Sequence, residues 1–168
     1  MSFETAIEPI LDCMCTALGE AGWEGECCLI PGTPSFDQCC EGGGEAWGRL
    51  VRAYPSASFP QEDGARNLLT ECTPNMLWAL VVELGAITCI CDDTCSCAKK
   101  AENATNVLGI SEAALQGVLC CFSSGPCKGQ EFIVTGLTPT NGFGGCGGFK
   151  IDLVVQYTMS CCPPEESV

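Results

Sequence analysis

The chain has 168 residues, enough for one domain with a hydrophobic core, and 21 acidic against 7 basic residues give a formal net charge of -14. This acidity disfavours proteins that wrap nucleic acid or bind anionic membranes, because both need clustered cations. The 17 cysteines come with no histidine, which removes Ser-His-Asp and Cys-His catalysis, so we expect no enzyme activity and no cofactor.

The cysteine content is typical of secreted, disulfide-rich proteins. The N-terminal segment MSFETAIEPILDCM, however, is acidic and lacks the basic region and long apolar run of a signal peptide. We therefore expect synthesis in a reducing cytosol and oxidation at a later stage.

The first predicted element is an amphipathic helix over residues 3–18, where Ile7, Ile10, Leu11, Met14 and Leu18 follow helical spacing. A turn-rich stretch follows, with a short strand over residues 27–30. Cys27 and Cys28 are neighbours on that strand, so their side chains are expected to point to opposite faces and into different environments. WGRLVRAY, residues 47–54, predicts the next strand.

Leu77–Cys91 is the most apolar segment and predicts the central strand of the sheet. Its first half is expected to be buried on both faces. Glu83 and Gly85 interrupt the apolar run, so the second half is expected to leave the core. Residues 47–54 and 77–90 are expected to pair as antiparallel strands.

Residues 91–110 are polar and are expected to be partly irregular. Residues 111–122 predict a second helix, with Ser111 as its N-cap and a buried stripe of Leu115, Val118, Leu119 and Phe122. Strands are predicted over residues 132–138 and 149–158, and the second of these alternates strictly between apolar and polar residues over most of its length.

This order predicts an α+β fold: a mostly antiparallel sheet of about four to five strands with two helices packed on it, and cysteine-rich loops. We expect residues 1–168 to form a single domain, with an extended C-terminal tail from about residue 160.

The sharpest metal candidate is a set of four thiols, Cys89, Cys91, Cys95 and Cys97, which could close a tetrahedral zinc site. Their spacing differs from the usual pair of CxxC knuckles, so disulfide bonds are the preferred interpretation and free buried thiols stay open. The candidate disulfide cysteines are Cys39, Cys40, Cys72, Cys89, Cys120, Cys121 and Cys146.

Two segments, WGRLVRAYPSASFP and LWALVVELGAITC, resemble a cysteine-rich structural family of long-tailed phages that infect actinobacteria. The matching regions are spread over most of the chain; they are Trp47–Pro60, Cys72, Trp78–Cys89 and Thr138–Leu153. The element order is similar to that of phage tail terminators, which are small α+β subunits. Their cysteine content is generally lower, which leaves an added cross-linking role open.

The resemblance implies a homo-hexameric ring that caps the tail tube and joins it to the head-side connector. Its expected partners are the major tail tube protein and the head-side stopper, with DNA passing through the lumen without specific binding and with no membrane. The expected location is the virion neck, after assembly in the host cytoplasm. A stopper or other neck connector is the alternative, and a disulfide- or zinc-stabilised binding module is the second alternative.

Overall fold

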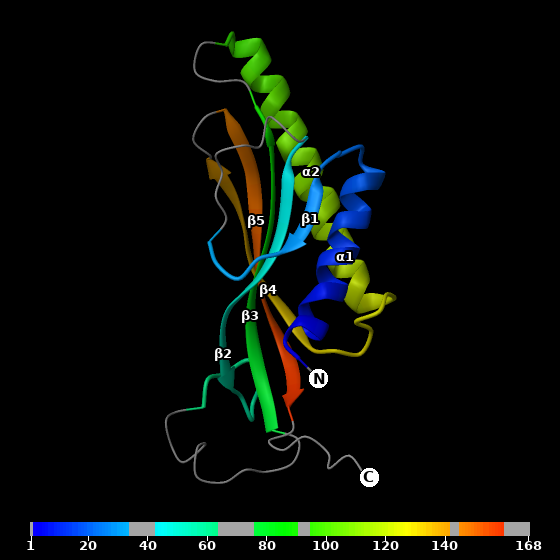
Figure 1. Cartoon of the computed structure of the whole chain (residues 1–168), viewed down its shortest axis with the longest axis vertical. Coiled ribbons are helices and arrows are strands. Elements are labelled where there is room, and N and C mark those ends of the chain that lie inside the picture. Colours follow the sequence, from blue (N-terminus) through cyan, green and yellow to red (C-terminus); the bar gives the residue numbers. More distant parts are fainter. Residues whose placement is uncertain (1, 34–42, 64–75, 91–94, 142–144, 160–168) are drawn as a thin grey trace.

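A computed structural model of the chain describes residues 2–33, 43–63, 76–90, 95–141 and 145–159 (Figure 1). It has two helices and a five-stranded, mostly antiparallel sheet, which confirms the predicted α+β class. In chain order the elements are α1 (Glu4–Glu20), β1 (Glu26–Leu29), β2 (Glu45–Pro55), β3 (Met76–Cys89), α2 (Cys97–Ser123), β4 (Phe132–Asn141) and β5 (Cys146–Met159).

The strand order in the sheet is β1-β2-β3-β5-β4, so β3 is central as predicted. The pairs β2–β3, β3–β5 and β4–β5 are antiparallel, and the short β1 pairs with β2 in parallel. β1 and β4 therefore form the two opposite edges of the sheet.

Both helices pack on the same face of the sheet, as Figure 1 shows. The main core lies between these layers, because alternate residues of each strand point toward the helices. From the sheet it takes Leu80, Val82 and Leu84 of β3 together with alternate residues of β5. From the helices it takes the apolar stripe of α1, which contains Ile10, Met14 and Leu18, all fully buried, and part of α2.

The predicted course of the central strand is wrong in one respect. Val82–Ile87, in the second half of β3, is buried at every position, whereas Leu77, Trp78 and Val81 in the first half are only partly buried. Glu83 stays inside because it has cationic partners, and Gly85 stays inside because an aromatic ring covers it. β3 leaves the core only at Thr88 and Cys89.

The second helix also differs from the prediction, because α2 begins at Cys97 and not after Ser111. Its N-cap is Ser96, whose side chain accepts a hydrogen bond from the Lys99 backbone N–H at 3.3 Å. Ser111 lies inside the helix, where its Oγ donates to the Leu108 carbonyl oxygen at 2.8 Å. The buried stripe is Ser111, Ala114, Val118, Cys121 and Phe122. Leu119, which was expected to be buried, is 42% exposed.

The remaining strand predictions agree with the structure within a few residues at each end. In β5, Phe149, Ile151 and Leu153 are buried while Lys150 and Asp152 are partly exposed, so the predicted alternation is confirmed. The predicted C-terminal tail from about residue 160 lies outside the described residues.

Candidate functional site

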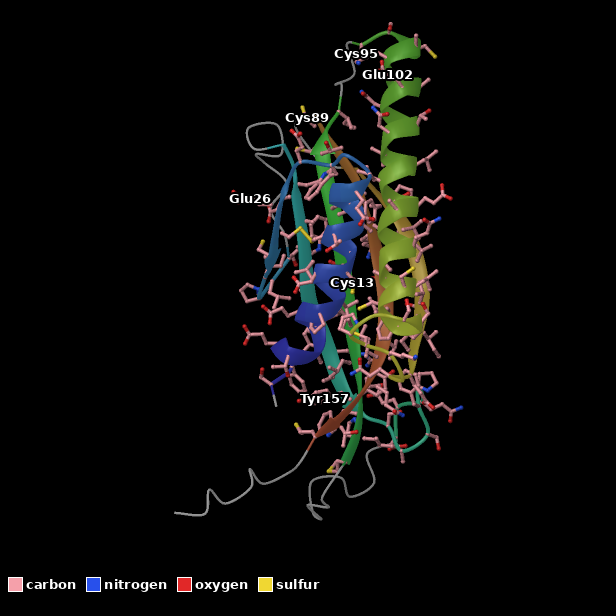
Figure 2. The ribbon with its side chains drawn as sticks, turned by 90° about the vertical axis from the view of Figure 1, so that its right-hand side faces the viewer. Cys13, Glu26, Cys89, Cys95, Glu102 and Tyr157 are labelled. Atoms are coloured by element: carbon pink, nitrogen blue, oxygen red, sulfur yellow. A yellow bond between two sulfur atoms is a disulfide. The ribbon has the colours of Figure 1, made fainter. Side chains whose placement is uncertain are left out.

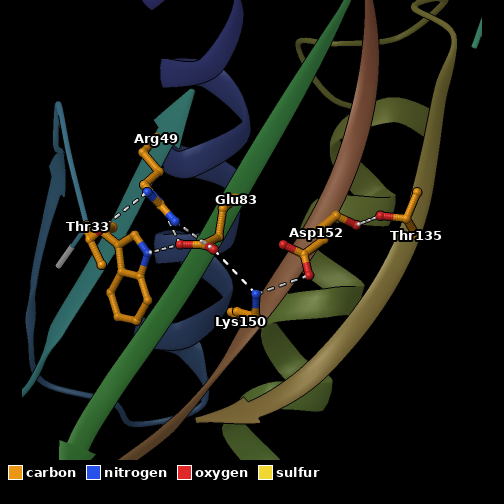
Figure 3. Close-up of polar contacts among 7 residues, drawn as sticks. Thr33, Arg49, Glu83, Thr135, Lys150 and Asp152 are labelled. Atoms are coloured by element: carbon orange, nitrogen blue, oxygen red, sulfur yellow. Dashed lines mark hydrogen bonds and ion pairs between the residues drawn. The ribbon is translucent and has the colours of Figure 1, made fainter. Parts of the chain in front are cut away.

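On the sheet face opposite the helices, Glu83 of β3 is the centre of a charged cluster (Figure 3). Its Oε1 accepts hydrogen bonds from Arg49 Nε at 2.7 Å and from Trp47 Nε1 at 3.3 Å. Its Oε2 accepts hydrogen bonds from Arg49 Nη2 at 3.1 Å and from Lys150 Nζ at 3.5 Å. The Glu83 side chain is only 8% exposed, so the carboxylate depends on these donors.

Strand register brings these residues together. Glu83 lies opposite Arg49 of β2 and opposite Asp152 of β5, and Lys150 is on the same face of β5 two residues before Asp152. Gly85 leaves room for the Trp47 indole, because a Cβ atom at position 85 would lie 2.3 Å from the ring. The cluster therefore connects β2, β3 and β5.

The environment of Glu83 favours its charged form. The hydrogen bonds from Arg49 lower its pKa most strongly; burial acts in the opposite direction, and Trp47 and Lys150 lower the pKa further. Because both carboxylate oxygens are satisfied by fixed donors, the arrangement can clamp three strands together.

An apolar groove of about 470 Å³ lies on the helix side of the sheet, between the N-terminal half of α2 and the strands β4 and β5. Val107 and Leu108 of α2 line it from one side, and Leu137 and Pro139 of β4 line it from the other. Leu108 is 65% exposed and Leu137 is 41% exposed, so the groove presents apolar side chains to solvent.

β4 is an edge strand as well as one wall of this groove. Its sequence FIVTGLTPTN contains no charged residue. Natural edge strands are usually protected from pairing with other chains by charges, bulges, prolines or a covering element. β4 has a bulge near Gly136 and one proline, Pro139, near its end. An edge of ten residues without any charge is a surface suited to contact with another chain.

The first turn of α2 extends beyond the end of the sheet in Figure 1, and Cys97–Ala101 is exposed throughout. By length and composition, α2 is the one described helix that could cross a membrane. Helices of soluble cores meet the same criterion, and the C-terminal half of α2 packs against α1 and the sheet.

The vicinal cysteines of β1 have different environments, as predicted. Cys27 forms a disulfide with Cys15 of α1, whereas Cys28 is an exposed free thiol near the Glu45 carboxylate. Sequence reasoning did not include Cys15 or Cys27 among the candidate disulfide cysteines. The sequence did contain a signal for this disulfide, because an amphipathic helix with cysteines is followed, after a short turn-rich segment, by a strand that also carries cysteines.

The structure describes three of the four zinc candidates, and these three are in different chemical states. Cys89 and Cys95 are disulfide-bonded, so their sulfurs are not thiolate ligands, and Cys97 is an exposed free thiol. Cys91 lies outside the described residues. Within the described ranges, no group of three or more histidine, cysteine, aspartate or glutamate residues could hold a metal ion.

The candidate disulfide cysteines also divide into groups. Cys89 and Cys146, which are register partners on β3 and β5, are both disulfide-bonded. Cys120 and Cys121 are free thiols on α2, contrary to expectation. Cys120 faces solvent and Cys121 faces the core, because adjacent helix positions point in different directions. The other candidates lie outside the described residues; they are Cys39, Cys40 and Cys72.

No protein-family model matches this chain, and no curated protein sequence matches it either.

Proposed function

We propose that this chain is a structural virion protein of a long-tailed phage, a tail terminator that caps the tail tube as a hexameric ring. The sequence support is the resemblance carried by Trp47–Pro60 and Trp78–Cys89. The α+β fold with two helices on one face of a five-stranded sheet is compatible with it. The ring then joins the tube to the head-side connector.

The observation that carries the proposal is the uncharged edge strand β4 beside the apolar groove. A ring needs a heterologous interface, in which one patch of each subunit contacts a different patch of the next. β4 and the groove would form the first patch. The buried Thr140 hydroxyl in the groove wall has no hydrogen-bond partner in the described part of the chain, which suits a site that receives another chain.

The opposite edge of the sheet supplies the second patch. β1 is short and mostly exposed, and it carries Glu26, while Lys100 on the first turn of α2 lines the groove. Glu26 and α2 lie on opposite sides of the molecule in Figure 2. When the two surfaces that meet in a repeating contact carry opposite charges, their attraction determines how neighbouring subunits are oriented. The occupant of the groove is therefore the β1 side of a neighbouring copy.

The overall acidity suits the proposed location. A ring around a DNA passage should offer few cations to the phosphates, because cations slow transit by binding them. With 7 basic residues and 21 acidic ones, the chain meets this requirement. The open sheet with two helices fits a terminator better than a β-barrel stopper or a mainly helical adaptor.

The test is deletion of the gene for this chain from the phage that encodes it, followed by electron microscopy of the products. A terminator predicts tails of uncontrolled length. Filled heads that leak DNA, with tails of normal length, would instead identify a stopper. Normal particles would contradict both neck roles and favour a disulfide-stabilised binding module. Re-expression of the wild-type chain in the deletion strain controls for effects on neighbouring genes.

A further inference from the structure

Three cysteine sulfurs meet where the two helices contact each other. Cys13 of α1 lies 2.6 Å from Cys121 of α2, measured between the two Sγ atoms. Cys121 lies 3.2 Å from Cys127, which follows α2. All three are free thiols in the structure, and Cys121, the central one, is fully buried. The site plays no part in the Glu83 cluster or in the β4 groove.

Close packing of the two helices creates this meeting point. At Gly117 a Cβ atom would lie 2.6 Å from Ala17 Cβ and 2.8 Å from the Cys13 carbonyl oxygen, so glycine permits the close approach. One turn back along α1 from Ala17 is Cys13, and one turn forward along α2 from Gly117 is Cys121. The second contact therefore lies one turn earlier in α1 and one turn later in α2, so the helices are antiparallel here and the two thiols face each other.

The distance between Cys13 and Cys121 is too short for ordinary contact. Non-bonded carbon atoms, which are smaller than sulfur, pack best at roughly 3.5–4.0 Å, whereas a disulfide bond is about 2.05 Å long. At 2.6 Å the two sulfurs lie between these limits, while the contact between Cys121 and Cys127 at 3.2 Å is longer. Cys13 is therefore better placed than Cys127 to bond with Cys121.

We infer that Cys13 and Cys121 are a cross-linking site, at which oxidation forms a disulfide that joins α1 to α2. The inference concerns the folded chain and stands whether or not the chain caps a tail tube. Cys127 is the competing partner for Cys121.

The oxidant in this reaction is a small-molecule disulfide of the glutathione type, which accepts the two electrons that the protein thiols lose. Cys13 is half-buried and lines a groove of about 790 Å³ between the helices, so the oxidant reaches it before it reaches the buried Cys121. The Cys13 thiolate attacks the small disulfide and releases one small thiolate. The Cys121 thiolate then attacks the mixed disulfide at the Cys13 sulfur and releases the second. Two protein thiols are oxidised, one small disulfide becomes two thiols, and the protons pass to the released thiolates.

The surroundings make this oxidation slow at neutral pH. The pKa of Cys13 is raised to about 12 and that of Cys121 to about 11, and burial is the main cause of both shifts. Asp12 and Cys120 raise the pKa of Cys13 further, and Glu8 and Glu20 also line the groove. Thiols in this environment stay protonated and reduced in the cytosol, and they oxidise on longer exposure outside it.

The test uses the full chain, purified under reducing conditions and then oxidised with glutathione disulfide. Remaining thiols are alkylated, the unreduced protein is digested, and linked peptides are identified by mass spectrometry. We expect a peptide pair that joins Cys13 to Cys121, with Cys127 alkylated. A pair that joins Cys121 to Cys127, or alkylation of all three thiols in folded protein, would overturn the inference.

Variants make the test specific. Cys13→Ser should abolish the linked pair, whereas Cys120→Ser, a change at an exposed neighbouring thiol, and Cys127→Ser should preserve it. The cross-link closes a long loop, so oxidation should raise Tm by roughly 10 °C more in the wild type than in Cys13→Ser. Circular dichroism of the reduced variants checks folding. An equal rise in both proteins would also contradict the inference.

Discussion

At the scale of single residues, Glu83 holds a buried negative charge within a strand that carries no other charge. The Glu83 carboxylate is stable there because Arg49, Trp47 and Lys150 donate to its two oxygens. Removing one member of a buried ion pair costs more than the pair itself contributes, because the remaining charge loses its partner.

Glu83→Gln should lower the free energy of unfolding by about 2–4 kcal/mol, because Arg49 would then lack its counter-charge and Lys150 would keep only its ion pair with Asp152. Urea denaturation followed by circular dichroism measures the change. Glu62→Gln is the matched control, since Glu62 pairs with Arg52 and both side chains are more than half exposed. That change should cost less than about 1 kcal/mol. Equal losses in the two variants would show that the Glu83 cluster does not stabilise the fold.

The lowered pKa of Glu83 predicts how this stability depends on pH. The unfolded chain binds more protons than the folded chain between the folded pKa and the unfolded value of about 4.3, so stability rises with pH in that window. The difference in unfolding free energy between wild type and Glu83→Gln should be constant at neutral pH. It should shrink as the pH falls below about 4, where Glu83 itself becomes protonated. A difference that stays constant in acid would contradict the ion-pair account.

The charged cluster was not predictable as a site. In the sequence pattern Glu83 is only an interruption of the apolar run, which predicts that the strand leaves the core at this point. Arg49 and Lys150 lie far from Glu83 in sequence, and only the strand register places them on both sides of it. The sulfur cluster was hidden for the same reason, because Cys13 and Cys121 meet through helix packing.

At the scale of elements, α2 shows what hydrophobic periodicity can detect. Its C-terminal half was predicted because it is amphipathic and packs against the core. Its N-terminal half was missed because it has no buried residue before Ser111, and therefore no buried apolar stripe. The overlooked signal was local: Ser96 before a run of strong helix formers, Ala98–Glu102, with an ion pair of Lys99 and Glu102 at 2.9 Å.

The contact between α1 and α2 predicts opposite effects for two glycines of the same helix. Gly117→Ala should destabilise the protein by about 1–2 kcal/mol, because overpacking against α1 exceeds the gain in helix propensity. Gly109→Ala should stabilise it by up to about 1 kcal/mol, since no atom lies within 4 Å of the added methyl group. Thermal unfolding shows whether each variant is more or less stable than the wild type. A Gly117→Ala variant that is more stable would contradict the tight contact between α1 and α2.

At the scale of the whole molecule, the proposed ring depends on β4 and the adjoining groove. Leu137→Lys should block assembly, because a charge on this edge would be buried against the neighbouring subunit. Leu119→Lys is the control, because Leu119 is 42% exposed, close to the 41% of Leu137, but lies outside the groove. Complementation of the deletion strain should fail with Leu137→Lys and succeed with Leu119→Lys. Failure of both, or success of both, would contradict the assignment of β4 to the ring interface.

The general architecture followed from the sequence because its strands and first helix bury regular apolar stripes. Assembly does not follow in the same way, since an interface is formed by surfaces that a single chain leaves exposed. The most direct measurement is cryo-electron microscopy of the head–tail joint of the phage that encodes this chain. The proposal predicts a six-fold ring of this fold between the tail tube and the connector, with β4 of each subunit against the β1 side of the next. Absence of the chain from the purified particle would contradict it.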